Sequence, residues 1–300
     1  MVRSLGGIGS GVVRTALGVA LALGLGFASA TVAVADTGSG SADPDLVAAP
    51  PGSNNWSCRP GPDHPRPVVL LHGTFENRLL NWFSLAPQLA GAGYCVYALD
   101  YGRSLGGSVS GVGPMAESAR QIADFVDQVL ASTGARQVDI VGHSQGGMLP
   151  RYYLKNLGGA GKVHTLVGLA PDNHGTTWGL LHLPVTLVPP ATTIVCPACT
   201  EQLPTSEFMR QLDSDPQVLP DVHYTVIATD TDEFATPHST SLLPPGPNVD
   251  NIVLQNVCPG DLSEHMLITS DPVAIRLVLN ALDPAHAVAP TCAPLQVGSA

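Results

Sequence analysis

Residues 137–147 read Gln-Val-Asp-Ile-Val-Gly-His-Ser-Gln-Gly-Gly, a short apolar run that ends in a Gly-x-Ser-x-Gly pentapeptide around Ser144. Residues 137–141 have the length and composition of a buried strand, and a helix-compatible run follows the serine. A serine on a sharp strand-to-helix turn has a strained backbone, and side chains two positions to either side would collide there, which explains both glycines. The turn exposes the hydroxyl and directs the N-terminus of a helix at negative charge developing beside it. The segment therefore predicts a nucleophile, Ser144, at the carboxyl end of a strand.

Strand-like and helix-like patterns alternate on both sides of this segment. Apolar runs typical of buried strands occupy residues 67–72, 93–99, 137–141, 163–169, 222–229 and 251–257. Helical patterns occupy residues 82–90 and 117–132, the run after Ser144, and residues 272–282. Such alternation implies parallel strands joined by right-handed crossovers. We therefore expect an α/β protein with a mostly parallel, doubly wound sheet of about six strands.

The N-terminal residues have the pattern of an export signal. Two arginines precede an uncharged stretch from Thr15 to Ala35, whose end fits the small-x-small cleavage rule. A membrane anchor is the alternative, because about 20 uncharged residues could span a bilayer. We expect a signal peptide at 1–35, an irregular arm at 36–66, and a catalytic domain at 67–300 that contains an insertion at 175–220.

Composition and cysteine usage narrow the function further. The formal net charge is −11 with only 13 Lys and Arg, which excludes a basic surface for nucleic acid. Six cysteines in an exported chain indicate up to three disulfides, and spacing does not choose among the 15 pairings. The Cys196-Pro-Ala-Cys199 segment also matches a redox dithiol or half a zinc site, but no second Cys-x-x-Cys accompanies it. We expect a disulfide there, no metal and no cofactor.

A serine hydroxyl needs a base, and the base needs an acid to hold it. Of the ten histidines, only His265 follows the last expected strand and precedes the last expected helix, where the base belongs. Asp230, Asp232 and Glu233 all follow the fifth expected strand. An acid a few residues before a proline favours Asp232, with Asp230 as the alternative. We therefore predict a triad of Ser144, Asp232 and His265.

An oxyanion hole requires two hydrogen-bond donors. The backbone N–H of Gln145, directly after the nucleophile, is one. The loop after the first expected strand, residues 71–74, supplies the other through Thr74, although a plain strand-end turn would look the same.

Residues 175–220 hold seven prolines and no strand pattern, and an insertion of this length is uncommon unless functional. Its apolar residues could wall an acyl chain, form a lid or simply pack in the core; they are Leu180, Leu181, Leu183, Val185, Leu187 and Val188. Just before it, Asp172 and His174 form a pair that lacks a third metal ligand, which favours a loop-shaping role.

The segments 71–74, 142–147 and 170–176 resemble secreted bacterial lipases of the actinomycete type, and residues 229–233 with Pro237 are similar to the acid loop of yeast lipase B. The resemblance extends from about residue 58 to residue 292. It implies an α/β-hydrolase fold, the triad above, and oxyanion roles for Thr74 and Gln145. It also implies three disulfides, which are Cys58–Cys95, Cys196–Cys199 and Cys258–Cys292.

Together these features predict a secreted, extracellular and monomeric carboxylic ester hydrolase of the triacylglycerol lipase class. Its partner is an ester or lipid substrate, met at a lipid–water interface. A short-chain esterase, a polyester hydrolase or an acyltransferase could use the same triad. A non-catalytic binding protein with this fold is the alternative from another class, but such proteins usually lose a triad member.

Overall fold

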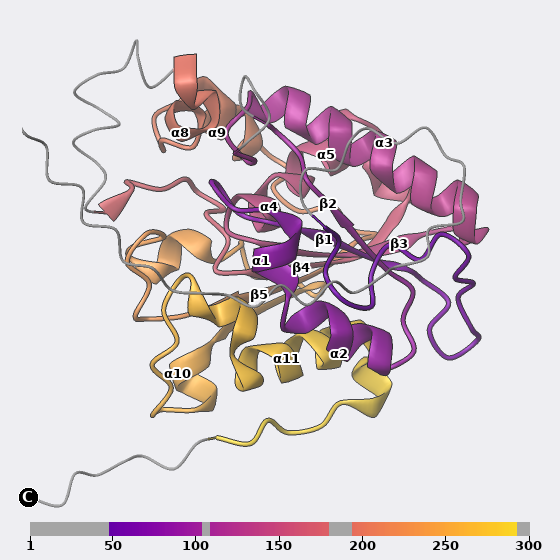
Figure 1. Cartoon of the computed structure of the whole chain (residues 1–300). Coiled ribbons are helices and arrows are strands. Elements are labelled where there is room, and N and C mark those ends of the chain that lie inside the picture. Colours follow the sequence, from indigo (N-terminus) through magenta and orange to yellow (C-terminus); the bar gives the residue numbers. More distant parts are fainter. Residues whose placement is uncertain (1–47, 104–108, 180–193, 293–300) are drawn as a thin grey trace, which may run out of the picture. The chain divides into compact units, whose positions relative to one another are not determined.

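The computed structural model describes residues 48–103, 109–179 and 194–292. The expected signal peptide at 1–35 and the six apolar insertion residues between Leu180 and Val188 lie outside these ranges. Six parallel strands form one sheet in the order β2-β1-β3-β4-β5-β6 (Figure 1). Their bounds are β1 Val68–Leu71, β2 Val96–Leu99, β3 Val138–His143, β4 Val163–Leu169, β5 His223–Ala228 and β6 Val249–Val253. The predicted α/β class and parallel sheet are confirmed.

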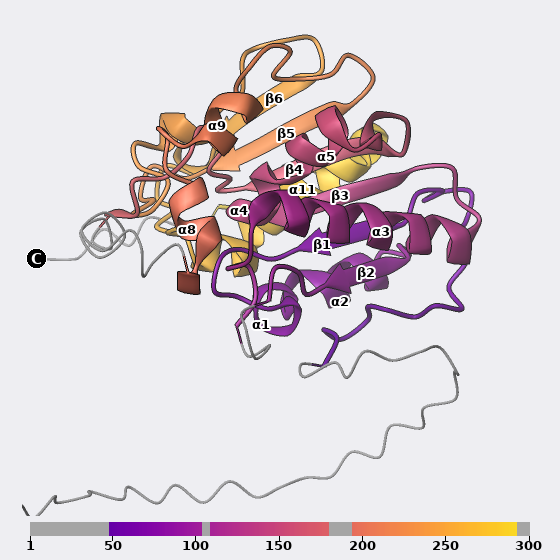
Figure 2. The ribbon, with the colours of Figure 1, turned by 90° about the horizontal axis from the view of Figure 1, so that it is seen from above.

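Helices cover both faces of the sheet because successive side chains of a strand point to opposite faces. Val69 and Leu71 of β1 belong to one core, and Val68 and Leu70 belong to the other. The first core is covered by α3 (Met115–Thr133), α5 (Pro150–Asn156), α8 (Pro197–Glu201) and α9 (Glu207–Leu212). The second is covered by α1 (Arg78–Trp82), α2 (Leu85–Gly91), α10 (Leu254–Val257) and α11 (Pro272–Leu282). Figure 1 shows helices on either side of the sheet, and Figure 2 looks down on the side of α3, α5, α8 and α9.

Two predicted elements differ from the structure. The helix expected at 82–90 is confirmed from Leu85 onward, as α2, but its start is wrong, because α1 ends at Trp82 and a turn at residues 83–84 separates the two. The strand expected at 251–257 is wrong over its second half, where residues 254–257 form α10. The ladder between β5 and β6 ends at the pair Ala228–Val253, so no partner is left for a longer strand. Leu254 instead turns into the second core, where it is fully buried.

The arm that precedes β1 is fastened to the edge strand β2. Asn54 donates to the carbonyl of Ala98 and accepts from its N–H, at 3.0 and 2.6 Å. The structure also contains the three disulfides that the resemblance implies, which are Cys58–Cys95, Cys196–Cys199 and Cys258–Cys292. The first joins the arm to the residue before β2, and the third joins the loop after α10 to the chain beyond α11.

The insertion between β4 and β5 contributes α8 and α9, which pack on the first core. None of the helices in the described ranges combines the length and apolarity that crossing a membrane requires.

Candidate active site

Ser144 lies at the sharp turn between β3 and α4 (Gln145–Met148), with a φ of 52° and a ψ of −123°. This conformation costs energy for a residue with a side chain, and such strain concentrates at functional sites. A methyl group on Gly142 would collide with the backbone carbonyl of Gly146, and one on Gly146 would collide with the carbonyl of Leu71. The two glycines are therefore required for the close approach of β3, α4 and the end of β1.

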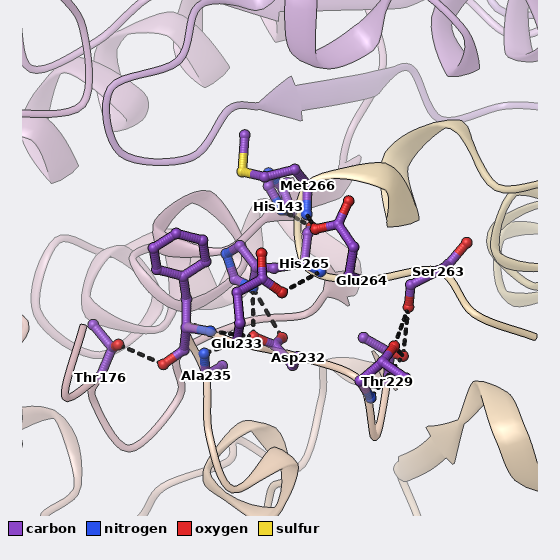
Figure 3. A network of polar contacts seen from close by, with 12 residues as sticks. His143, Thr176, Thr229, Asp232, Glu233, Ala235, Ser263, Glu264, His265 and Met266 are labelled. Atoms are coloured by element: carbon purple, nitrogen blue, oxygen red, sulfur yellow. Dashed lines mark hydrogen bonds and ion pairs between the residues drawn. The ribbon is translucent and has the colours of Figure 1, made fainter. Parts of the chain in front are cut away.

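His265 and Asp232 lie side by side, on the loops that follow α10 and β5 (Figure 3). The His265 Nδ1 lies 3.0 and 2.9 Å from the two carboxylate oxygens of Asp232, and both side chains are buried. Asp232 Oδ1 also accepts the N–H groups of Phe234 and Ala235, at 2.8 and 2.7 Å. These donors fix the carboxylate, and the carboxylate in turn orients the imidazole so that Nε2 is left for another partner.

The alternative acid, Asp230, is placed elsewhere. Its side chain is exposed, and its backbone N–H donates to Gln255. The loops of the acid and the histidine are tied together by the hydroxyls of Thr229 and Thr231, which both donate to the carbonyl of Ser263, at 2.6 and 2.8 Å. The structure therefore brings Asp232, rather than Asp230, to the imidazole.

Ser144 and His265 line one pocket of about 330 Å³. Aromatic and sulfur-containing side chains make up much of its wall, and polar groups lie around the serine. The other lining residues are Thr74, Phe75, Glu76, Asp172, Thr176, Trp178, Gln202, Phe234, Ala235 and Met266. The pocket thus combines a nucleophile and a base with space for an apolar group.

The two predicted oxyanion residues are in contact through their side chains. Gln145 Nε2 donates to the hydroxyl of Thr74 at 3.0 Å and to the carbonyl of Gly111 at 2.9 Å. Gln202, which follows α8, donates to the same hydroxyl at 3.1 Å. Sequence reasoning missed Gln202, because one amide in a proline-rich insertion carries no local pattern.

A second missed feature is the contact between Glu76 and His143. The carboxylate Oε2 of Glu76 lies 2.8 Å from His143 Nδ1 and accepts the N–H of Gly73 at 2.9 Å. The other ring nitrogen of His143 lies 2.9 Å from the backbone carbonyl of His265. One imidazole therefore links the loop after β1, the nucleophile turn and the loop of the catalytic histidine candidate.

Both groups of this bridge have shifted pKa values. Burial acts to lower the pKa of His143, but the charge and hydrogen bond of Glu76 outweigh burial and raise it. Burial acts to raise the pKa of Glu76, but the charge and hydrogen bond of His143 outweigh burial and lower it. Both shifts favour the ionised pair, in which the two imidazole N–H groups donate to Glu76 and to the carbonyl of His265.

Glu76→Gln is expected to lower kcat roughly 10- to 100-fold. The loop after β1 and the loop of His265 are both held by the contact between Glu76 and His143, and the variant weakens that contact. The pKa of His143 is higher in the folded protein than its ordinary value of 6.5. The stability that His143 contributes is therefore fully present below pH 6.5, and it is lost as the pH rises through the pKa of the folded state. Glu76 has a lowered folded pKa, so its contribution is present above 4.5 and is lost only at more acidic pH. Thermal midpoints should therefore differ most between wild type and variant near pH 5–6, and less as the pH rises.

Glu117→Gln, which removes an exposed partner of Arg120, is the matched control and should leave both profiles unchanged. A midpoint difference for Glu76→Gln that stays constant across the pH range would contradict the proposed ion pair.

Asp172 and His174 do not converge. Asp172 lines the pocket, whereas His174 Nδ1 lies 3.0 Å from Asp213, beyond α9. Among residues 48–103, 109–179 and 194–292, no group of three His, Cys, Asp or Glu side chains could hold a metal ion.

Comparison with known proteins places this geometry in a family. A family model described as Lipase (class 2) matches residues 65–277. A triacylglycerol lipase of Pseudarthrobacter phenanthrenivorans is 38% identical over 91 residues, which are 29% of this chain and 27% of the relative. The chain thus matches about a quarter of the length of that curated relative.

Two solved structures share the fold. Aspergillus fumigatus lipase B has a TM-score of 0.63 at 21% identity, over 81% of this chain and 57% of the other. A mature Bacillus licheniformis lipase has a TM-score of 0.55 at 15% identity, over 75% of this chain and 94% of the other. At these identities the likeness establishes the α/β-hydrolase fold. Because the family match covers more than half of the chain and includes Ser144, Asp232 and His265, the chain belongs to the lipase (class 2) family.

Proposed function

We propose that this chain is an exported carboxylic ester hydrolase of the triacylglycerol lipase class. Ser144 is its nucleophile, His265 its general base and acid, and Asp232 the carboxylate that orients the imidazole. The observation that carries the proposal is the shared pocket: a strained serine and a carboxylate-bound imidazole face the same 330 Å³ of space. Family membership supports the same chemistry.

In the first step, His265 Nε2 takes the hydroxyl proton of Ser144 while the serine oxygen attacks the ester carbonyl. The carbonyl oxygen becomes an oxyanion, which the backbone N–H groups of Thr74 and Gln145 stabilise. The contacts of the Thr74 hydroxyl with Gln145 and Gln202 hold this loop in place. His265 then gives its proton to the leaving alkoxide oxygen, the alcohol departs, and an acyl-enzyme remains.

In the second step, His265 takes a proton from water, and the water oxygen attacks the acyl carbonyl at the same oxyanion site. The serine oxygen leaves with the proton from His265, and a carboxylic acid is released. Asp232 orients the imidazole and stabilises the imidazolium that forms in each step.

The rim of the pocket supports a lipid surface as the place of action. Phe75 and Met266 line the pocket and are about half exposed, at 52% and 45%. Leu80 and Phe83, on and next to α1, and Leu267 of the neighbouring 3-10 helix are more exposed still. Exposed apolar patches of this kind are typical of interaction sites. Export is supported by the disulfides, which persist in oxidising compartments.

The test is a hydrolysis profile over acyl lengths from C2 to C18, with p-nitrophenyl esters in solution and triacylglycerols in emulsion. We expect hydrolysis of both kinds and covalent labelling of the protein by a fluorophosphonate probe. The double variant Leu80→Ser, Phe83→Ser should lose several-fold activity on the emulsion and none on a soluble C4 ester. A wild type that neither labels nor hydrolyses any ester would favour the non-catalytic binding protein instead.

A further inference from the structure

Asp172 is a buried carboxyl group that the triad does not use. It follows β4, is 1% exposed, and lines the same pocket as Ser144 and His265. Neither of its carboxyl oxygens has a hydrogen-bond partner in another residue. Buried polar side-chain atoms nearly always have a partner, so one that faces a pocket without any points to a ligand group.

The loop that carries Asp172 is held rigidly by its neighbours. Asn173 donates to the carbonyl of Ser241 at 2.6 Å, and its own carbonyl accepts from the buried Arg151 at 2.6 Å. The N–H of Thr176 donates to the carbonyl of Gln202 at 2.9 Å. The carboxyl of Asp172 is therefore presented by a fixed backbone rather than by an adaptable loop, which favours binding a partner at low entropic cost.

The other polar side chains that line the pocket beside Ser144 and His265 each have at least one hydrogen-bond partner. The hydroxyl of Thr74 contacts Gln145 and Gln202, and the Thr176 hydroxyl donates to the carbonyl of Phe234 at 2.8 Å. Among the described side chains that line the pocket, Asp172 is the carboxyl group whose two oxygens both lack a partner in another residue.

The chemistry of the partner follows from the two protonation states of Asp172. Burial raises its pKa to about 6, and the negative charge of Asp232 acts in the same direction. The hydrogen bond from its own backbone N–H and the charges of His265 and His143 oppose this shift. The ionised form can only accept hydrogen bonds, and the protonated form can accept as well as donate. A hydroxyl group can donate to Asp172 in either state, whereas a carbonyl or ether oxygen would require the protonated one. A hydroxyl is thus the partner that fits over the whole neutral range.

We propose that Asp172 is a specificity-determining residue that accepts a hydrogen bond from a substrate hydroxyl close to the scissile carbonyl. The preferred substrates are then hydroxylated esters, rather than esters that are apolar on both sides of the carbonyl. This inference rests on the proposed hydrolase function and adds a substrate class to it. The hydroxyl can belong to the acyl part or to the alcohol part of the ester, and the two are separated by experiment.

The test compares kcat/KM for two pairs of isosteric esters in which a hydroxyl replaces a methyl group. Ethyl 3-hydroxybutyrate against ethyl 3-methylbutyrate probes the acyl side, and 2-hydroxyethyl butyrate against propyl butyrate probes the alcohol side. Each ratio is measured for wild type, for Asp172→Leu, which has the same branched skeleton of four side-chain heavy atoms and no polar one, and for Asp172→Asn, which keeps an acceptor oxygen. Met266→Leu is the matched control, because it replaces one apolar side chain of the pocket wall by another and changes no polar group.

In one of the two pairs, we expect the hydroxyl-to-methyl ratio to fall about tenfold in Asp172→Leu, which corresponds to one hydrogen bond in the transition state. Asp172→Asn should keep most of the preference, and Met266→Leu should keep all of it. Equal ratios in wild type and Asp172→Leu for both pairs would overturn the inference while leaving the hydrolase proposal intact. If the wild type prefers ethyl 3-aminobutyrate to ethyl 3-methylbutyrate by a larger kcat/KM ratio than it prefers ethyl 3-hydroxybutyrate, the hydroxyl group is overturned as the partner of Asp172. A wild type that hydrolyses none of the esters would overturn the hydrolase proposal itself.

Discussion

Ser144→Ala is expected to lower kcat for ester hydrolysis by about a millionfold, the size of effect seen when a triad nucleophile is removed from a serine hydrolase. The loss is this large because no other hydroxyl lies at the strained turn between β3 and α4, opposite His265. Alanine and serine both carry a Cβ atom, so the backbone at a φ of 52° is no more strained in the variant. Initial rates on a soluble C4 ester, with labelling by a fluorophosphonate probe, measure the effect.

Ser132→Ala is a suitable control, because Ser132 lies near the end of α3 and donates to a backbone carbonyl within the same helix. It should label and hydrolyse like wild type. Labelling that survives in Ser144→Ala would assign the nucleophile to another residue.

Asp232→Asn is expected to lower kcat by about 10⁴-fold, with little change in KM. The amide keeps the size of the side chain, and its oxygen can still accept the N–H groups of Phe234 and Ala235. It no longer supplies the charge that stabilises the imidazolium, and it favours the wrong tautomer of His265. Single-turnover and steady-state rates across pH 6–9 would separate this loss from a defect in substrate binding.

Asp230→Asn is the matched control for this variant. It makes the same chemical change two residues away, on an exposed side chain that does not contact the imidazole. It should retain activity within about twofold, since surface substitutions of this kind are usually near neutral. Equal losses from the two variants would mean that the loop, rather than the Asp232 carboxylate, matters for the reaction.

The features that sequence reasoning predicted well are those set by local patterns. Apolar runs and helical periodicity predicted the strands and the longest helices. The Gly-x-Ser-x-Gly turn can be recognised from residues 142–146 alone. Chain order predicted that His265 lies near Ser144, and the two residues do line one pocket. The turn between Trp82 and Leu85 and the end of β6 were missed, since both depend on packing and on where a neighbouring strand stops.

The supporting residues of the site could not be predicted in this way. Glu76 and His143 are 67 positions apart, and Thr74 and Gln202 are 128 apart, so no spacing rule relates the members of either pair. The sequence suggested that Asp172 pairs with His174, and because no third metal ligand accompanied the pair, a loop-shaping role was predicted for both. The fold instead turns the histidine towards Asp213 and leaves the carboxyl against the pocket. Such relations exist only after the sheet has brought the strand ends together.

Two of the three disulfides act on the ends of the folded domain. Cys58–Cys95 secures the segment that enters the sheet, and Cys258–Cys292 secures the segment that leaves the last helix. Chain ends are where folded proteins fray first and where proteases first gain access. Fraying from either side is therefore stopped at Cys58 and at Cys292, where the chain is bonded covalently to the body of the domain. Loss of order between these two cysteines must then start from within the domain.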